Sequence, residues 1–249
     1  MAAGRMTAIY LATLLAATAA RADPIADFYQ GRQVNFILST GEGGGYSSYA
    51  RAFAPFLTRH LPGHPAMVVQ SMPGAGGIRA MLHLASIAPR DGSTIAMVHA
   101  GVPFAPLFSL RGATFDPRAM NWLGGLSRAA GVCIAWAGSG IATWDDLRAK
   151  EFIVGSSGVG SQMETYPAML NKLYGTKIKI VTGYKGGNDV YLAMERGEVH
   201  GRCGSAISSV ELSRPGWVRD GKVTVPILFD TQRSPALPGV PSVMELAPG

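Results

Sequence analysis

The sequence predicts an α/β protein built from two units of similar design, with a ligand cleft between them. Short apolar runs of strand length alternate with helical segments in both halves of the chain, a rhythm typical of parallel sheets covered by helices. In each half, two of these runs end in a glycine- or serine-rich loop. Because ligands lie at the carboxyl ends of the strands in such sheets, loops of this kind in both units indicate a shared cleft.

The first unit is organised around residues 33–51. The apolar run 34–38 predicts a buried strand, and the glycines that follow it allow a sharp turn or a close approach to a ligand. Ser47 is expected to cap a helix that continues through Leu57. Unpaired N–H groups at the positive end of a helix favour anions. From this stretch alone, an anion site and a plain tight turn are both open.

A second strand, loop and helix follow. Residues 66–72 are apolar enough for another buried strand, residues 73–77 form a Pro-Gly-Ala-Gly-Gly loop, and residues 78–88 have a helical pattern. A third strand is expected over 94–99. His99 ends that strand, on the side where the cleft is expected.

Residues 100–128 are irregular and contain several prolines, which indicates a crossing into a second unit. The expected elements of that unit are strands over 131–136, 152–154, 177–182 and 199–203, and helices from Thr143, over 162–174 and over 189–196. A last strand over 223–229 could lead back to the first unit. The expected domains are therefore 23–126 together with 228–249, and 127–227.

Residues 1–22 are expected to be a secretory signal peptide. Arg5 precedes an uncharged apolar stretch over 6–20, and Ala20-Arg21-Ala22 has the pattern of a cleavage site. The apolar stretch is short for a membrane span, so a membrane anchor is the weaker alternative. The mature chain is then exported, and without Arg5 and Arg21 its formal charge falls from +6 to +4.

Several motifs of enzymes are missing from the sequence. It has no G-x-S-x-G elbow and no phosphate loop ending in G-K-[ST], and Tyr46 replaces the last glycine of a G-x-G-x-x-G pattern. A proline and a glycine between His60 and His64 break any helix that could join them in a metal site. Ser157 has no visible histidine and aspartate partners, and no basic patch with aromatics indicates nucleic acid. No catalytic residue, metal or cofactor is expected.

An ordered set of short motifs points to a family. The motifs are the segments 27–34, 43–51, 61–65, 73–77, 88–92, 155–161, 184–187 and 237–246. From about residue 27 to its end, the chain resembles the substrate-binding proteins of tripartite tricarboxylate transporters, the Bug family. The resemblance implies a monomeric, two-lobed, type II periplasmic binding protein fold. Such a protein closes around a small carboxylate in the periplasm and delivers it to the membrane permease subunits of the transporter.

The resemblance also implies a set of ligand-binding positions. In the family, two loops of the first lobe hold a carboxylate through backbone N–H groups and hydroxyls, and loops of the second lobe close over the ligand. With His99 and Arg202 added, the candidate positions in this chain are Gly43, Gly44, Gly45, Tyr46, Ser47, Pro73, Gly74, Ala75, Gly76, Gly77, His99, Ser157, Gly158, Gly160, Ser161, Tyr184, Lys185, Gly186 and Arg202.

The chain departs from the family pattern in two places. Ser47 stands where many members have aspartate, which leaves the ligand preference open. Family members also continue well past the segment 241–246. The C-terminal helices are therefore expected to be missing from this chain, with some apolar faces exposed.

Cys133 and Cys203 are the two cysteines of the chain. An even number in an exported protein permits a disulfide, and two buried thiols are the alternative. In folds of the implied type, the strand that crosses into the second lobe runs antiparallel beside the third parallel strand of that lobe. Neighbouring strands lie about 4.5–5.5 Å apart, within the span of a disulfide, so a bond between Cys133 and Cys203 is expected.

Two functions other than transport are open. The same two-lobed fold can carry an enzyme, such as a hydrolase or transferase that uses Ser157 or Lys185, or a ligand sensor for a signalling partner. A fold alone does not choose among these functions.

Overall fold

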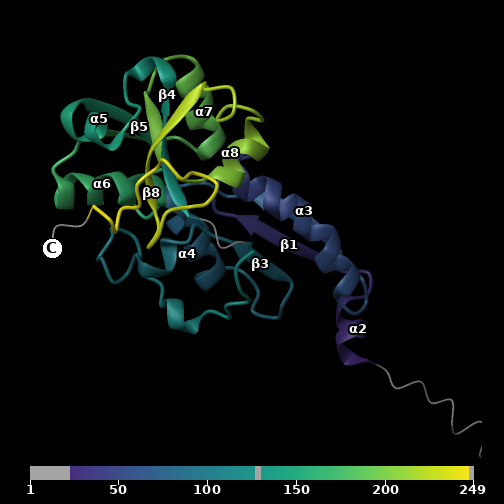
Figure 1. The fold of residues 1–249 in the computed structure, drawn as a ribbon. Helices are drawn as coiled ribbons and strands as arrows, with labels where there is room; N and C mark the ends of the chain where they lie inside the picture. Colours follow the sequence, from purple (N-terminus) through teal and green to yellow (C-terminus); the bar gives the residue numbers. More distant parts are fainter. Residues whose placement is uncertain (1–22, 127–129, 247–249) are drawn as a thin grey trace, which may run out of the picture.

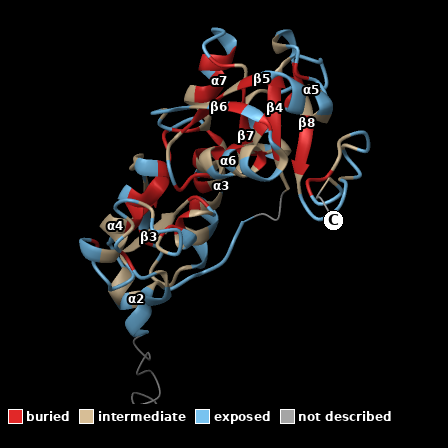
Figure 2. Cartoon of the chain, turned by 90° about the vertical axis from the view of Figure 1, so that its left-hand side faces the viewer, coloured by how far each residue is buried: buried red, intermediate tan, exposed pale blue. Residues whose placement is uncertain are grey.

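The computed structural model describes residues 23–126 and 130–246. Figure 1 and Figure 2 show two lobes, each built around its own sheet. The strand order is β2-β1-β3 in the first sheet and β6-β5-β7-β4-β8 in the second. This arrangement confirms the expected α/β fold with two lobes.

In the first lobe, the central strand β1 pairs in parallel with a strand on each side. The strands are β1 (Gln33–Leu38), β2 (Ala66–Ser71) and β3 (Thr94–Met97). The helices are α2 (Pro24–Tyr29), α3 (Gly45–His60) and α4 (Ile78–Ser86), with 3₁₀ turns at Ala75–Gly77, Val102–Phe104 and Pro117–Ala119.

β2 differs from the expected buried strand, because none of its residues is buried and their exposure alternates along the strand. β2 is an edge strand that is packed on one face only. Met67 and Val69 pack against the buried cluster that includes Phe36 and Ala54, whereas Val68, on the other face, is 37% exposed. The apolar run in the sequence predicts that residues 66–71 form a strand, but it does not predict how far the strand is buried.

In the second lobe, β5 pairs in parallel with β6 and β7, whereas β4 runs antiparallel between β7 and β8. The strands are β4 (Gly131–Trp136), β5 (Glu151–Ser156), β6 (Lys177–Thr182), β7 (Gly201–Ala206) and β8 (Val223–Phe229). The helices are α5 (Trp144–Ala149), α6 (Gln162–Tyr174), α7 (Gly187–Glu195) and α8 (Ile207–Ser213), with a 3₁₀ turn at Ala137–Ser139. α8 follows β7 directly and was not expected from the sequence.

The capped start of α5 is as expected. The Thr143 hydroxyl accepts a hydrogen bond from the N–H of Asp146 (3.2 Å), and the Asp146 carboxylate accepts one from the N–H of Thr143 (3.1 Å). This reciprocal capping box satisfies two N–H groups that a helix start otherwise leaves unpaired.

The chain from β8 onward packs on the second lobe, which differs from the expected return of residues 228–249 to the first domain. β8 pairs with β4, and Leu228 forms a parallel bridge with Ser242. Ile227 packs with Val243 and Leu246 in one core cluster, while Leu228 belongs to the other. β8 therefore buries side chains on both faces of the second sheet, which holds residues 228–246 there. Residues 247–249 lie outside the described residues.

Cys133 of β4 and Cys203 of β7 form a disulfide across the two antiparallel strands. The pairing shifts register between Val132 and Ile134, and Gly204 has a φ of +75°. A left-handed glycine at such a shift is typical of a β-bulge, which bends a strand and redirects its side chains. Arg202, next to the disulfide, lies at this bend.

Among residues 23–126 and 130–246, no helix is long and apolar enough to cross a membrane. The same residues contain no group of three or more histidine, cysteine, aspartate or glutamate side chains that could hold a metal ion. The expected signal peptide, residues 1–22, lies outside the described residues.

Candidate functional site

The loops that were expected to bind ligand meet where the two lobes face each other. The N–H of Gly41 donates to the carbonyl of Lys185 (2.8 Å), and the N–H of Gly76 donates to the carbonyl of Ser157 (3.1 Å). α8 of the second lobe lies beside α3 of the first (Figure 1). Direct contacts between the lobes therefore close the site.

The start of α3 provides hydrogen-bond donors on the first lobe. Gly44 is the N-cap residue, with an extended backbone, and the helix begins at Gly45. In the described ranges, the N–H groups of Gly45, Tyr46 and Ser47 have no hydrogen-bond partner. Unpaired first-turn donors at the positive end of a helix favour an anion. This part of the expected anion site thus has three donors available.

Ser47 is not the helix cap that the sequence suggested. It is the third residue of α3; its hydroxyl donates to Glu42 (3.1 Å) and accepts from the N–H of Gly43 (3.4 Å). Glu42 also accepts hydrogen bonds from Ser71 and Arg51. The hydrogen bond from Ser71, followed by that from Arg51, holds the pKa of Glu42 below its ordinary value. Glu42 is therefore ionised, and Arg51 offsets its charge.

The loop after β2 contacts the second lobe directly. Residues 74–77 all have positive φ angles. A Cβ atom on Gly76 would collide with the carbonyl oxygens of Gly158 and Val159, so only glycine fits between the lobes at this position. The N–H of Gly76 donates a hydrogen bond to the carbonyl of Ser157 in the opposite lobe. That N–H therefore joins the two lobes and is not available to a ligand.

His99, just after β3, is 4% exposed and has a buried nitrogen without a partner. Its ring and that of Tyr46 form a T-shaped pair with the centroids 4.9 Å apart, and its backbone N–H donates to the Ser39 hydroxyl (3.0 Å). Its Nε2 finds no hydrogen-bond partner within the described residues. Burial, and then the positive charge of Arg202 in the other lobe, lower the pKa of His99 to about 4. The imidazole is therefore neutral at pH 7.

Arg202 on β7 is a buried charged residue of the second lobe. It is 7% exposed, and its guanidinium carbon lies 4.8 Å from the centre of the Tyr191 ring. Within residues 23–126 and 130–246, no carboxylate forms an ion pair with Arg202, and its Nε has no hydrogen-bond partner. The hydroxyl of Ser157 is also buried without a partner there.

Several of the other predicted residues contribute backbone and turns where the lobes meet. Lys185 is exposed and contacts Gly41 through its carbonyl, and Gly186 lies against Gly41 as well. The Ser161 hydroxyl donates to the carbonyl of Gly158 (2.7 Å) and stabilises the turn before α6. The Gly160 carbonyl lies close to Gly101 of the first lobe. Pro73 and Tyr184 are half-buried within their own lobes: the Pro73 carbonyl accepts a hydrogen bond from Arg79 (3.4 Å), and Tyr184 packs against the core of the second lobe.

Sequence reasoning missed Gly187 and Asn188, which begin α7. Asn188 lies against Gly43, and a Cβ atom on Gly187 would collide with the guanidinium of Arg202. The signal was present, because Gly187 ends the motif 184–187, Asn188 follows it directly, and a glycine at a helix start permits close approach.

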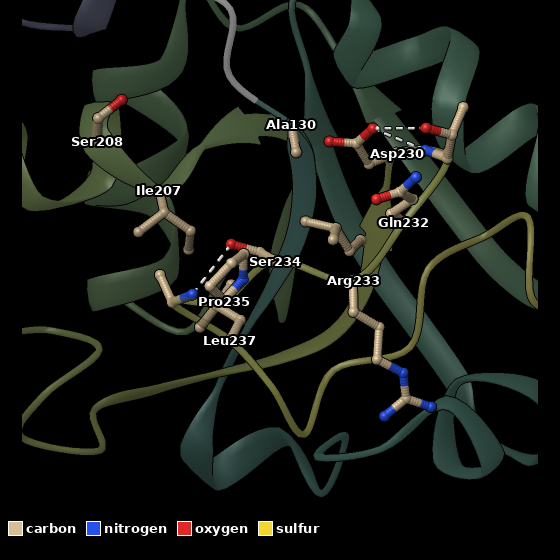
Figure 3. Close-up of a pocket in the computed structure, with 12 residues that line it drawn as sticks. Ala130, Ile207, Ser208, Asp230, Gln232, Arg233, Ser234, Pro235 and Leu237 are labelled. Atoms are coloured by element: carbon tan, nitrogen blue, oxygen red, sulfur yellow. Dashed lines mark hydrogen bonds between the residues drawn. The ribbon is translucent and has the colours of Figure 1, made fainter.

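A pocket of about 430 Å³ lies on the second lobe and is distinct from this site (Figure 3). Its described lining residues are Ala130, Ile207, Ser208, Leu228, Asp230, Thr231, Gln232, Arg233, Ser234, Pro235, Ala236 and Leu237. Figure 3 shows the Arg233 side chain extending away from the other labelled residues, and Glu245 pairs with it (2.8 Å). The pocket contains no predicted site residue.

Comparisons with solved structures place this architecture among periplasmic binding proteins. The periplasmic binding protein BugD is 22% identical, with a TM-score of 0.70 over 88% of this chain and 72% of that chain. R. palustris Rpa4515 with adipate is 22% identical, with a TM-score of 0.72 over 86% of this chain and 71% of that one. MatC from Rhodopseudomonas palustris with bound malate is 22% identical, with a TM-score of 0.72 over 86% of this chain and 72% of that one. At this identity the likeness shows the two-lobed fold.

A comparison with curated protein sequences gave no match. The family model described as tripartite tricarboxylate transporter family receptor matches residues 50–249. That match covers most of the chain, including the first-lobe loop 73–77 and the loops of the second lobe that meet at the site, and it begins after the loop that precedes α3. The chain therefore belongs to the family of tripartite tricarboxylate transporter receptors, which are solute-binding proteins rather than enzymes.

Proposed function

We propose that the protein binds a small carboxylate between its lobes and presents it to the permease subunits of a tripartite tricarboxylate transporter. One observation carries the proposal: His99 Nε2, Ser157 Oγ and Arg202 Nε are buried, they have no hydrogen-bond partner among the described residues, and they come from both lobes. Buried polar groups are nearly always hydrogen-bonded. A polar ligand held between the lobes accounts for all three atoms.

Each lobe has a separate part in the proposed binding. In the first lobe, the N–H groups of Gly45, Tyr46 and Ser47 receive a carboxylate at the positive end of α3. In the second lobe, Ser157 and Arg202 supply a hydroxyl and a positive charge. Adipate and malate in two related structures are carboxylates of the proposed class.

The proposed site of action is the periplasm. A signal peptide over residues 1–22 would export the chain, and a receptor of this family works with a membrane transporter. The mature receptor is proposed to act as a monomer, with closure of the two lobes around the ligand creating the surface that the permease recognises.

A thermal unfolding panel tests the proposal. A ligand that binds only the folded state at about 100 times its dissociation constant adds about 2.7 kcal/mol to the free energy of unfolding. We expect at least one mono-, di- or tricarboxylate to raise the melting temperature, and its neutral amide to leave it unchanged. Recovery of the acid unaltered separates a receptor from a hydrolase or transferase. A folded protein that no carboxylate stabilises would refute the proposal.

A further inference from the structure

We infer that the disulfide between Cys133 and Cys203 is a positioning element of the binding site, because it fixes the register of β7 in which Arg202 lies at that site. The inference rests on the proposed function, in which Arg202 supplies a positive charge to the ligand. The bond then has a part in ligand binding, beyond the stability that a disulfide gives to the fold.

The first step is that β7 has one residue more than the strand opposite it. Val132 of β4 pairs with Ser205 of β7. Two residues further along β4, Ile134 pairs with Arg202, which is three residues away from Ser205. β7 therefore has one extra residue, at 203–204, and the strand bulges there.

The second step is that the bulge turns Arg202 toward the site. In a regular strand, side chains alternate between the two faces of the sheet, so residues 202 and 205 would lie on opposite faces. Here both lie at Tyr191: the Arg202 guanidinium carbon is 4.8 Å from the centre of its ring, and the Ser205 hydroxyl is 3.5 Å from its hydroxyl. Cys203 lies on the other face, in the core cluster that contains Cys133 and Phe152.

The third step is what the loss of the bulge would do. Suppose that Ser205 keeps its partner on β4 but the pairing beyond it becomes regular. Arg202 would then face the apolar cluster that now holds Cys203, away from the ligand. Cys203 would face the opposite way, where its sulfur could not reach that of Cys133. The disulfide is therefore compatible with the register that brings Arg202 to the site and incompatible with the regular one.

The fourth step is that little else holds this part of β7. On its other side, β7 pairs with β5 at Val154 and Gly201. In the described part of the sheet, no further pair joins β5 to residues 202–206. The register of these residues therefore depends on β4 and on the disulfide.

The charge of Arg202 is a further reason for a covalent bond at this position. Arg202 is 7% exposed, and no carboxylate among the described residues forms an ion pair with it. Asp189, the acidic residue in the first turn of α7, accepts a hydrogen bond from the N–H of Lys185 (3.1 Å). A buried charge without a partner is costly. Without ligand, that cost favours movement of Arg202 toward solvent, and the bond opposes the movement.

Calorimetry with adipate, malate and citrate compares the wild type with two variants that lack the bond, Cys133→Ala/Cys203→Ala and Cys133→Val/Cys203→Ala. We expect the acid that binds the wild type most tightly to lose at least about tenfold in affinity, because the apparent affinity falls with the fraction of molecules in which the site is formed. The control is Ile178→Ala. It removes a side chain from the same core cluster but leaves the bond, so it should bind as the wild type does.

Arg202→Gln separates positioning from general stability. We expect it to weaken binding at least about tenfold as well, and the variant that lacks both the bond and Arg202 should bind no more weakly than Arg202→Gln alone. Losses that add would show that the bond and Arg202 act independently and would overturn the inference, as would wild-type affinity without the bond. Bond-free variants that do not fold would overturn it too, because the bond would then serve the lobe as a whole.

His99 reports the position of Arg202 without any ligand. Burial, and then the positive charge of Arg202, lower the pKa of His99. An NMR titration of the His99 ring should therefore give a higher pKa in Arg202→Gln and in the bond-free variants, and the wild-type pKa in Ile178→Ala. An unchanged pKa without the bond would contradict the inference. If the pKa rises but none of the three acids binds the folded wild type, the positioning of Arg202 stands and the proposed function fails.

Discussion

At the scale of single residues, the site depends on polar side chains that are buried, an environment that usually costs free energy. His99 was expected from the sequence only because it ends a strand, and Arg202 only as an added candidate. In the structure, both are buried and each has a nitrogen without a hydrogen-bond partner among the described residues, and burial depends on how the two lobes meet. Ser47 was expected from the sequence to cap α3, but the helix begins two residues earlier, at Gly45. The Ser47 hydroxyl therefore forms hydrogen bonds with Glu42 and Gly43 and does not cap the helix.

His99 should make the ligand-free protein less stable in acid. Its pKa is about 4 in the folded protein and about 6.5 in an unfolded chain. Between these values the unfolded state binds the proton and the folded state does not, so the free energy of unfolding falls as the pH falls. The loss is at most about 1.4 kcal/mol per pH unit. Urea unfolding at pH 7, 6 and 5 measures it.

The matched variants for this prediction are His99→Gln and His60→Gln. We expect His99→Gln to flatten the dependence between pH 6.5 and 4, because the titrating group is gone. His60 is exposed at the end of α3, so His60→Gln should keep the wild-type slope. Identical slopes in wild type and His99→Gln would show that other groups control the acid response.

At the scale of elements, local pattern predicted the helices and strands well. α6 (Gln162–Tyr174) and β6 (Lys177–Thr182) have the bounds expected from the sequence, because each is a continuous periodic segment between glycines or turns. The sheet to which β8 belongs could not be predicted in the same way. Its pairing with β4 joins segments far apart in the chain, and its apolar residues would suit the core of either lobe.

The loop before α4 gives a prediction about contact between the lobes. Gly76 has a φ of +61° and touches the backbone at Gly158 and Val159, whereas Gly112 has a φ of +83° and a Cβ atom there would meet no other atom within 4 Å. Alanine at either position should cost about 1 kcal/mol through the backbone alone. Only Gly76→Ala should also weaken carboxylate binding, because it keeps the lobes apart.

Calorimetry with a carboxylate that binds the wild type checks this prediction, together with urea unfolding of both variants. We expect ligand affinity to fall at least about tenfold in Gly76→Ala. A tenfold loss corresponds to a clash that costs the closed state about 1.4 kcal/mol. Gly112→Ala should bind as the wild type does. If Gly76→Ala binds normally, the loops do not meet in the ligand-bound protein.

At the scale of the whole molecule, the two lobes share one plan. The orders β2-β1-β3 and β6-β5-β7 match, and the second sheet continues from β7 to β4 and β8. In the described part of the chain, β3 has no strand on its outer side. In the segment that follows it, Leu107, Phe108 and Leu123 are 77%, 67% and 82% exposed. The sequence predicted two units of the same design, but not that their sheets differ in size, since strand count depends on distant pairing.

The last prediction concerns export, which decides where the whole molecule acts. Cleavage after Ala22 should give a mature chain that starts at Asp23. That position suits the fold, because Asp23 caps α2 and its side chain accepts the N–H of Ile25 (3.0 Å). Signal peptidases need small residues at the cleavage site. In a Gram-negative host, Ala22→Leu should therefore accumulate as the uncleaved precursor, while Ala16→Leu, within the apolar stretch, should be processed normally. Intact mass spectrometry of periplasmic and membrane fractions measures both, and an intact Met1 in the membrane fraction of the wild type would instead show an anchor.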